Sequence, residues 1–145
     1  SYDFRVAGGV TDKVRNHPKA SNLNFLGRVP RDKIKDEFAS ADIFVLPGLA
    51  EGSATVVYEA MSAGLAIITT KSSGSVIEDG QTGLIVPERS PEAITEAIYT
   101  LSTDRALRNR LAKAAREESV KYNWDSYAEG LLSIIDQVPS PMARN

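Results

Sequence analysis

Five short segments of this chain are apolar enough to form buried strands. They are residues 4–7, 23–26, 43–46, 66–69 and 84–86, and most are bounded by Gly, Pro, Asn or Asp. Short runs of this kind, rich in Val, Ile, Leu and Phe, are typical of strands that are covered on both faces. Because helical patterns lie between them, the sequence predicts an α/β fold with a Rossmann-like parallel sheet and helices on both faces.

Apolar residues at helical spacing follow the strands. Ile34, Phe38 and Ala41 form one such stripe before the third strand. Three further stripes follow the last strand, and their apolar members are predicted to be buried: Ile94, Ala97, Ile98 and Leu101; Leu107, Leu111 and Ala115; and Tyr127, Leu131, Leu132 and Ile135. Ser90 and Asp104 stand where the first two of these helices need an N-cap.

Length and composition predict one domain. The 145 residues are 42% hydrophobic, which is enough to bury a core without disulfides. We expect this domain to occupy residues 1–138, with a flexible polar tail at residues 139–145. Since Ser1 leads almost directly into the first strand, we expect the domain to be truncated at its N-terminus.

Charge, cysteine content and hydropathy exclude several functional classes. The chain has seventeen basic and nineteen acidic residues, so its net charge does not favour binding to nucleic acid. Cys is absent, which excludes a disulfide framework and a thiol nucleophile. No apolar run approaches the roughly 18 residues of a transmembrane helix, so a soluble, cytoplasmic domain is expected. The single histidine, His17, lies in a polar loop and is expected to have a surface role.

The most informative stretch lies between residues 46 and 64. A strand ends at Pro47-Gly48, a loop of small residues follows, and a helix rich in Val, Ala and Met begins with Ser53 as its expected N-cap. Such a junction presents unpaired N–H groups and the positive end of the helix dipole. It therefore favours binding of a phosphate group.

Two carboxylates flank this junction. Glu51 lies in the loop and Glu59 in the helix, and a fully helical interval would separate them by about 12 Å along the axis and roughly 80° of rotation. A carboxylate can accept two hydroxyl hydrogen bonds from a sugar or a ribose, and the amides between the two suit a diphosphate. The pattern suggests a ligand ordered as sugar, diphosphate and ribose. Two solvated surface glutamates would give the same pattern.

The stretch resembles the donor-binding motif of retaining glycosyltransferases of the GT-B fold (family 4, group 1), through Glu51-x7-Glu59 followed by Ala60-Met61-x-x-Gly64. Three further segments resemble the same family, in the expected order: Asn24-Phe-Leu-Gly27-x-Val29, Ala41-Asp42-x-x-Val45-x-Pro47 and Asp79-Gly80-x-x-Gly83-Leu84-x-Val86. The similarity covers residues 4–135. The chain departs from the family at Gly48, where a Ser is usual, and at Gly52-Ser53-Ala54, where an aromatic–glycine pair is usual.

The resemblance implies the C-terminal, donor-binding domain of a hexosyltransferase that transfers a sugar from a nucleoside diphosphate sugar with retention. Glu51 would be the catalytic residue, holding the donor sugar beside the reacting carbon, and Glu59 would bind the ribose hydroxyls. The other implied donor-binding residues are Gly52, Ser53, Thr55, Val56, Arg28 and Val29. Amides near Thr55 and Val56 would meet the diphosphate, and Arg28 and Val29 would lie against the base. No cofactor and no metal ion is expected beside the donor substrate.

The resemblance also implies parts that this chain lacks. These are an N-terminal acceptor-binding domain and the basic pair that relatives place against the diphosphate. Alone, residues 1–145 are therefore expected to bind a nucleoside diphosphate weakly and to transfer no sugar. The resemblance is also compatible with peripheral membrane contact by the full-length chain. Two other functions fit the same residues: half of a GT-B sugar-nucleotide hydrolase or epimerase, and a non-catalytic nucleotide-binding or regulatory α/β module.

Overall fold

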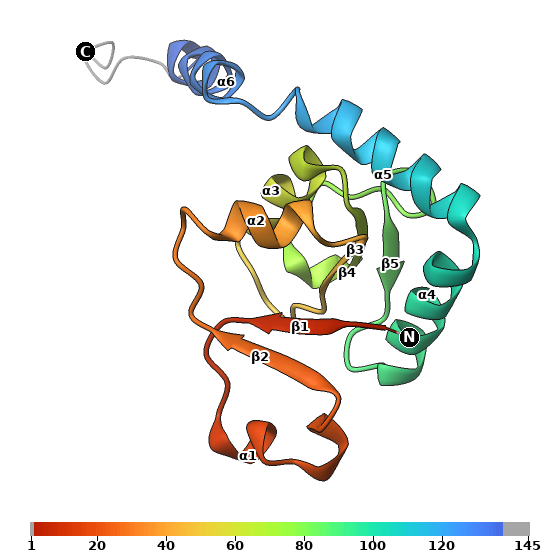
Figure 1. Cartoon of the computed structure of the whole chain (residues 1–145). Coiled ribbons are helices and arrows are strands. Elements are labelled where there is room, and N and C mark those ends of the chain that lie inside the picture. The colour runs from red at the N-terminus through yellow and green to blue at the C-terminus, as the bar shows by residue number, and fades with distance from the viewer. Residues whose placement is uncertain (1, 138–145) are drawn as a thin grey trace. The chain divides into compact units, whose positions relative to one another are not determined.

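The computed structural model of the chain describes residues 2–137 (Figure 1). The chain divides into two compact units, one before and one after the peptide bond between Ser40 and Ala41. The predicted flexible tail, residues 139–145, lies outside the described residues.

The first unit is built on two parallel strands. β1 (Phe4–Ala7) pairs with β2 (Leu23–Gly27), and α1 (Asp12–Arg15) and the 3-10 turn η1 (Pro18–Ala20) connect them. α2 (Ile34–Ala39) follows β2 and is tied to β1 by Arg5, whose guanidinium donates to Glu37 Oε2 at 2.8 Å. His17 is exposed, and its Nδ1 accepts the Lys19 amide at 3.2 Å, so this histidine caps η1.

The second unit is built on three parallel strands. They are β3 (Ile43–Leu46), β4 (Ala66–Thr70) and β5 (Leu84–Val86), hydrogen-bonded in the order β3-β4-β5. α3 (Thr55–Ala63) connects β3 to β4, and the 3-10 turn η2 (Lys71–Ser73) follows β4. The five predicted strands are thus present in the described residues, in parallel pairs, and the predicted α/β class is confirmed. Their ladders form two sheets, one in each unit.

Two long helices supply much of the core of the second unit. α4 (Pro91–Thr103) and α5 (Arg105–Ser119) follow β5 and lie beside it in Figure 1. Leu101 of α4 and Leu111 of α5 are fully buried and pack in one cluster with Ala66 and Ile68 of β4. The predicted caps are confirmed, because the Ser90 hydroxyl accepts the Ala93 amide at 3.3 Å and an Asp104 carboxylate oxygen accepts the Leu107 amide at 2.9 Å.

The end of α3 delivers the chain directly into β4. Gly64 is the C-cap residue with φ of 79°, a conformation that favours glycine, and the Leu65 amide donates back to the Ala60 carbonyl at 3.1 Å. Every residue of β4 is buried. This tight reversal places the carboxyl ends of β3 and β4 next to each other, at the edge where the candidate site lies.

α6 (Trp124–Gln137) forms where a helix is predicted, but its burial was predicted wrongly. Tyr127, Leu131, Leu132 and Ile135 are between 45% and 64% exposed. Apolar spacing determines which side chains share a helix face, but that face is buried only if another element packs against it. No element among the described residues covers the apolar face of α6. No helix within residues 2–137 is long and apolar enough to cross a bilayer.

Candidate functional site

The predicted site lies in the second unit, where β3 ends and α3 begins. The loop after β3 carries Glu51, Gly52 and Ser53, all exposed, and the first turns of α3 carry Thr55, Val56 and Glu59. Val56 and Glu59 are half-buried. In open parallel sheets ligands bind outside the carboxyl ends of the strands, which is where this segment lies.

The start of α3 differs from the prediction. The helix begins at Thr55 with Ala54 as its N-cap, and no side chain caps it. Ala54 has φ of −80° and ψ of 83°, close to an inverse γ-turn, and the Ser53 carbonyl accepts the Thr55 amide at 3.0 Å. The prediction that Ser53 is the N-cap is therefore wrong, because the carbonyl of Ser53, and not its hydroxyl, accepts the hydrogen bond from the Thr55 amide. The rise and rotation calculated for a helical interval from Glu51 to Glu59 also do not apply.

The site leaves several polar groups without protein partners. Within residues 2–137, no acceptor takes the amide hydrogen of Val56, whereas the Thr55 amide is engaged by Ser53. The carboxylates of Glu51 and Glu59 likewise make no hydrogen bond or ion pair with another described residue. A half-buried helix carboxylate and a free amide near the same helix N-terminus can bind hydroxyls and an anionic oxygen, respectively.

Buried hydroxyl groups at the end of β4 hold the loop after β3. Thr69 Oγ1 lies 3.0 Å from the Leu46 carbonyl and 2.7 Å from Ser73 Oγ, and Thr70 Oγ1 donates to the Gly48 carbonyl. Sequence reasoning missed Thr69 and Thr70. The available signal was the change from aliphatic side chains to Thr69 and Thr70 at the end of an otherwise apolar strand.

The next strand end joins the same network. Glu88, just after β5, accepts the Ser72 amide at 3.1 Å and the Ser72 hydroxyl at 2.8 Å, and the Ser72 carbonyl accepts the Glu51 amide at 3.0 Å. The hydrogen bond from the Ser72 hydroxyl is the largest cause of a lowered pKa of the exposed Glu88 carboxyl. The loops after β3, β4 and β5 are therefore linked through Ser72.

Arg28 and Val29 lie in the first unit, directly after β2. Arg28 is exposed and Val29 is half-buried. Their predicted role against a nucleotide base stays a prediction.

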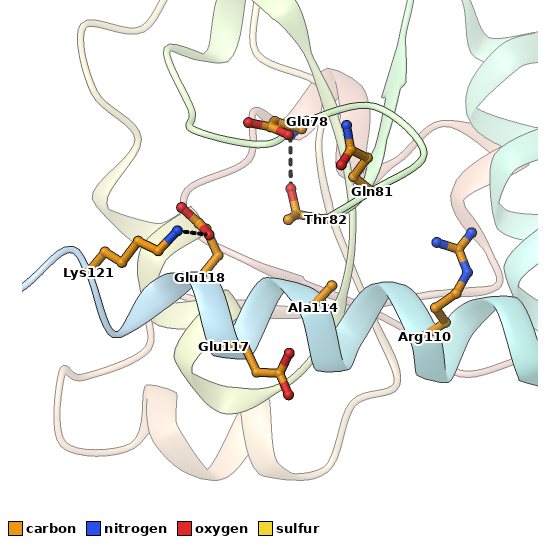
Figure 2. A pocket seen from close by; sticks show the side chains of 8 residues that line it. All are labelled: Glu78, Gln81, Thr82, Arg110, Ala114, Glu117, Glu118 and Lys121. Atoms are coloured by element: carbon orange, nitrogen blue, oxygen red, sulfur yellow. Dashed lines mark hydrogen bonds and ion pairs between the residues drawn. The ribbon is translucent and has the colours of Figure 1, made fainter.

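A hollow elsewhere in the same unit differs from the predicted site. It holds about 500 Å³ between α5 and the loop that precedes β5, and Figure 2 shows its lining residues. Lys121 Nζ lies 2.6 Å from Glu118 Oε2, Arg110 donates to the Gly80 carbonyl at 3.2 Å, and the Glu78 amide donates to Thr82 Oγ1 at 2.8 Å. Much of its polar lining is thus already paired, and it lies at the amino end of β5. Within residues 2–137 no cluster of three His, Cys, Asp or Glu residues could hold a metal ion.

Comparison with known families identifies the family to which the chain belongs. The family model for glycosyl transferases group 1 matches residues 4–118, which is most of the chain. The chain belongs to the group 1 glycosyltransferases. Their shared activity is sugar transfer, and the family resemblance carried by the four motifs is confirmed.

Individual relatives of this glycosyltransferase chain are considerably longer. The sulfoquinovosyl transferase SQD2 of Arabidopsis thaliana is 36% identical over 105 residues, which cover 69% of this chain and 21% of SQD2. The C-terminal domain structure of a group 1 glycosyltransferase, LpcC of Francisella tularensis, is 25% identical with a TM-score of 0.67, covering 76% of this chain and 58% of that one. Anabaena HepE in complex with UDP shares the fold, with a TM-score of 0.78, 16% identity, and coverage of 94% of this chain and 41% of HepE.

The match to the group 1 glycosyltransferases contains the whole candidate site. It begins at β1, includes the Glu51–Glu59 segment and the linked loops after β4 and β5, and ends at residue 118, before α6. The resemblance was predicted to extend to residue 135, so the family match is shorter at its C-terminal end.

Proposed function

We propose that this chain is the donor-binding domain of a retaining glycosyltransferase that uses a nucleoside diphosphate sugar. One observation carries the proposal: two glutamates without protein partners flank a helix N-terminus with a free amide, at the carboxyl ends of parallel strands, in a group 1 glycosyltransferase. Glu59 binds the ribose hydroxyls, the Val56 amide meets the diphosphate, and Glu51 holds the donor sugar.

Sugar transfer breaks the bond between the anomeric carbon and an oxygen of the β-phosphate. The bonding electrons leave with the diphosphate, so negative charge grows next to the N-terminus of α3, where the helix dipole and the Val56 N–H stabilise it. The acceptor oxygen bonds to the anomeric carbon, and its proton passes to the departing β-phosphate oxygen. Glu51 lies in the loop before this helix, so its carboxylate binds sugar hydroxyls beside the reacting carbon.

The remaining predicted contacts are assigned by position. Gly52 and Ser53 lie in the exposed loop between the sugar and diphosphate subsites, where backbone amides approach a ligand closely. The Thr55 amide would have to leave the Ser53 carbonyl to meet a phosphate, so Val56 is the first donor available to it. Arg28 and Val29 would lie against the base.

Complete transfer is proposed to need more protein than these 145 residues. The acceptor has to be positioned for attack, and orientation of two reactants supplies a large share of the rate. We therefore expect residues 1–145 to bind a nucleoside diphosphate in the high-micromolar range or more weakly, without transfer.

Nucleotide binding by the 145-residue chain tests the proposed function. Its melting temperature should rise with millimolar UDP, GDP, ADP or dTDP, because a ligand that binds only the folded state stabilises it. We expect one base to give the largest rise, and inorganic phosphate at the same ionic strength to give little. UDP is included because the HepE structure is a complex with UDP. No rise with any of the four nucleotides would contradict the proposal and favour a non-catalytic, regulatory α/β module.

A further inference from the structure

The loop that carries Glu51 rests directly on the backbone of Gly74. Gly74 follows η2 and has φ of 60°. A Cβ atom built on Gly74 would lie 2.7 Å from the carbonyl oxygens of both Glu51 and Gly52. These distances are far shorter than a carbon–oxygen van der Waals contact, so only glycine allows this approach.

Gly74 differs in this respect from the other glycines with positive φ among residues 2–137. A Cβ at Gly80, with φ of 71°, would meet nothing within 4 Å, and the same holds at Gly8 and Gly27. At Gly64 the nearest atom, 3.5 Å away, belongs to the flexible side chain of Arg116. At Gly74 the obstacle is backbone, which cannot rotate out of the way.

The direction of the Glu51 side chain depends on this contact. Glu51 donates its amide to the Ser72 carbonyl at 3.0 Å, so the turn at residues 71–74 holds the residue on one side. Its Cγ lies 3.1 Å from where a Cβ of Gly48 would stand, so the side chain also packs over the Gly48 backbone. A displacement of the Glu51 and Gly52 carbonyls would therefore move the Glu51 carboxylate as well.

We propose that Gly74 is a positioning residue that fixes the Glu51–Gly52 backbone, and through it the Glu51 carboxylate, against the donor sugar. This inference rests on the proposed function. Gly74 contacts the backbone of Glu51 and Gly52, whereas the proposed ribose and diphosphate contacts come from Glu59 and Val56 in α3, so we expect its effect to be largest at the sugar subsite.

The matched pair Gly74→Ala and Gly80→Ala tests this role. Both substitutions introduce a Cβ at positive φ and carry similar backbone strain, but only the first displaces another loop. Calorimetry would measure affinities for the nucleotide that binds the parent chain tightest among UDP, GDP, ADP and dTDP, and for its glucose ester. We expect the ratio of the dissociation constant of the glucose ester to that of the free nucleotide to rise about tenfold in Gly74→Ala and to stay unchanged in Gly80→Ala.

A second variant tests the same loop without introducing a Cβ atom against its backbone. Glu88→Ala removes both hydrogen bonds to Ser72, whose carbonyl holds the Glu51 amide, at an exposed position where folding is not at risk. The same ratio should rise two- to fivefold, while Glu96→Ala, an exposed glutamate of α4, leaves it unchanged. Equal ratios in all four variants and the parent would overturn the positioning role and leave the proposed function standing. Failure of the parent chain to bind any nucleotide would overturn both.

Discussion

Replacing Glu59 by alanine is expected to weaken nucleoside diphosphate binding at least tenfold. Removal of a carboxylate that accepts two hydroxyl hydrogen bonds should cost about 1–3 kcal/mol of binding free energy. Glu59 is half-buried on α3, which limits compensation by water. Isothermal calorimetry of parent and variant with the same nucleotide measures the loss.

Two further variants show whether the loss comes from the ribose contact. Glu59→Gln keeps one acceptor oxygen, and its affinity should fall between those of the parent and the alanine variant. Glu96→Ala removes an exposed carboxylate of α4 that is not among the predicted contacts, and this variant should bind like the parent. Equal affinities for Glu59→Ala and the parent, with unchanged circular dichroism, would remove Glu59 from the site.

Replacing Leu111 by alanine is expected to lower the free energy of unfolding by about 2–5 kcal/mol. Leu111 of α5 is fully buried and packs in the cluster that contains Ile68 of β4 and Leu101 of α4. Truncation removes buried apolar surface and leaves a cavity that three elements surround, which they can close only in part. Urea denaturation followed by circular dichroism measures the change.

Leu132→Ala is the matched control for the core variant. Leu132 lies on α6 and is 59% exposed, so its truncation should change the unfolding free energy by no more than about 0.5 kcal/mol. If Leu132→Ala destabilised the chain as much as Leu111→Ala, the assignment of the core to the β4–α4–α5 cluster would be wrong.

The strands and two of the helix caps could be predicted because their signals are local. A short apolar run bounded by turn residues, such as residues 43–46, is typical of a buried strand, and Ser90 and Asp104 each cap an amide three residues ahead. Ser53 carries the same type of local signal, yet the prediction failed there. The outcome depended on the φ and ψ angles of Ala54, which let a carbonyl take the amide first.

Contacts between distant residues could not be predicted from the sequence. Thr70 and Gly48 are 22 positions apart, and Ser72 and Glu88 are 16 apart, so no periodicity records that they meet. The prediction that α6 is buried failed for a related reason, because an apolar stripe does not specify which surface would cover it. The order β3-β4-β5 brings together the loops that follow these strands. The surroundings of Glu51 and Glu59 therefore depend on the tertiary fold and not on the local sequence.

The most direct test of the donor site is to map nucleotide binding on the 145-residue chain by amide NMR. The chain would be titrated with the nucleotide of the panel that raises its melting temperature most. The proposed site predicts that the amide resonances of Gly52, Ser53 and Val56 shift most and fit one dissociation constant. Shifts that gather instead at Gln81, Thr82 and Ala114, in the hollow of Figure 2, would contradict a donor site at the start of α3.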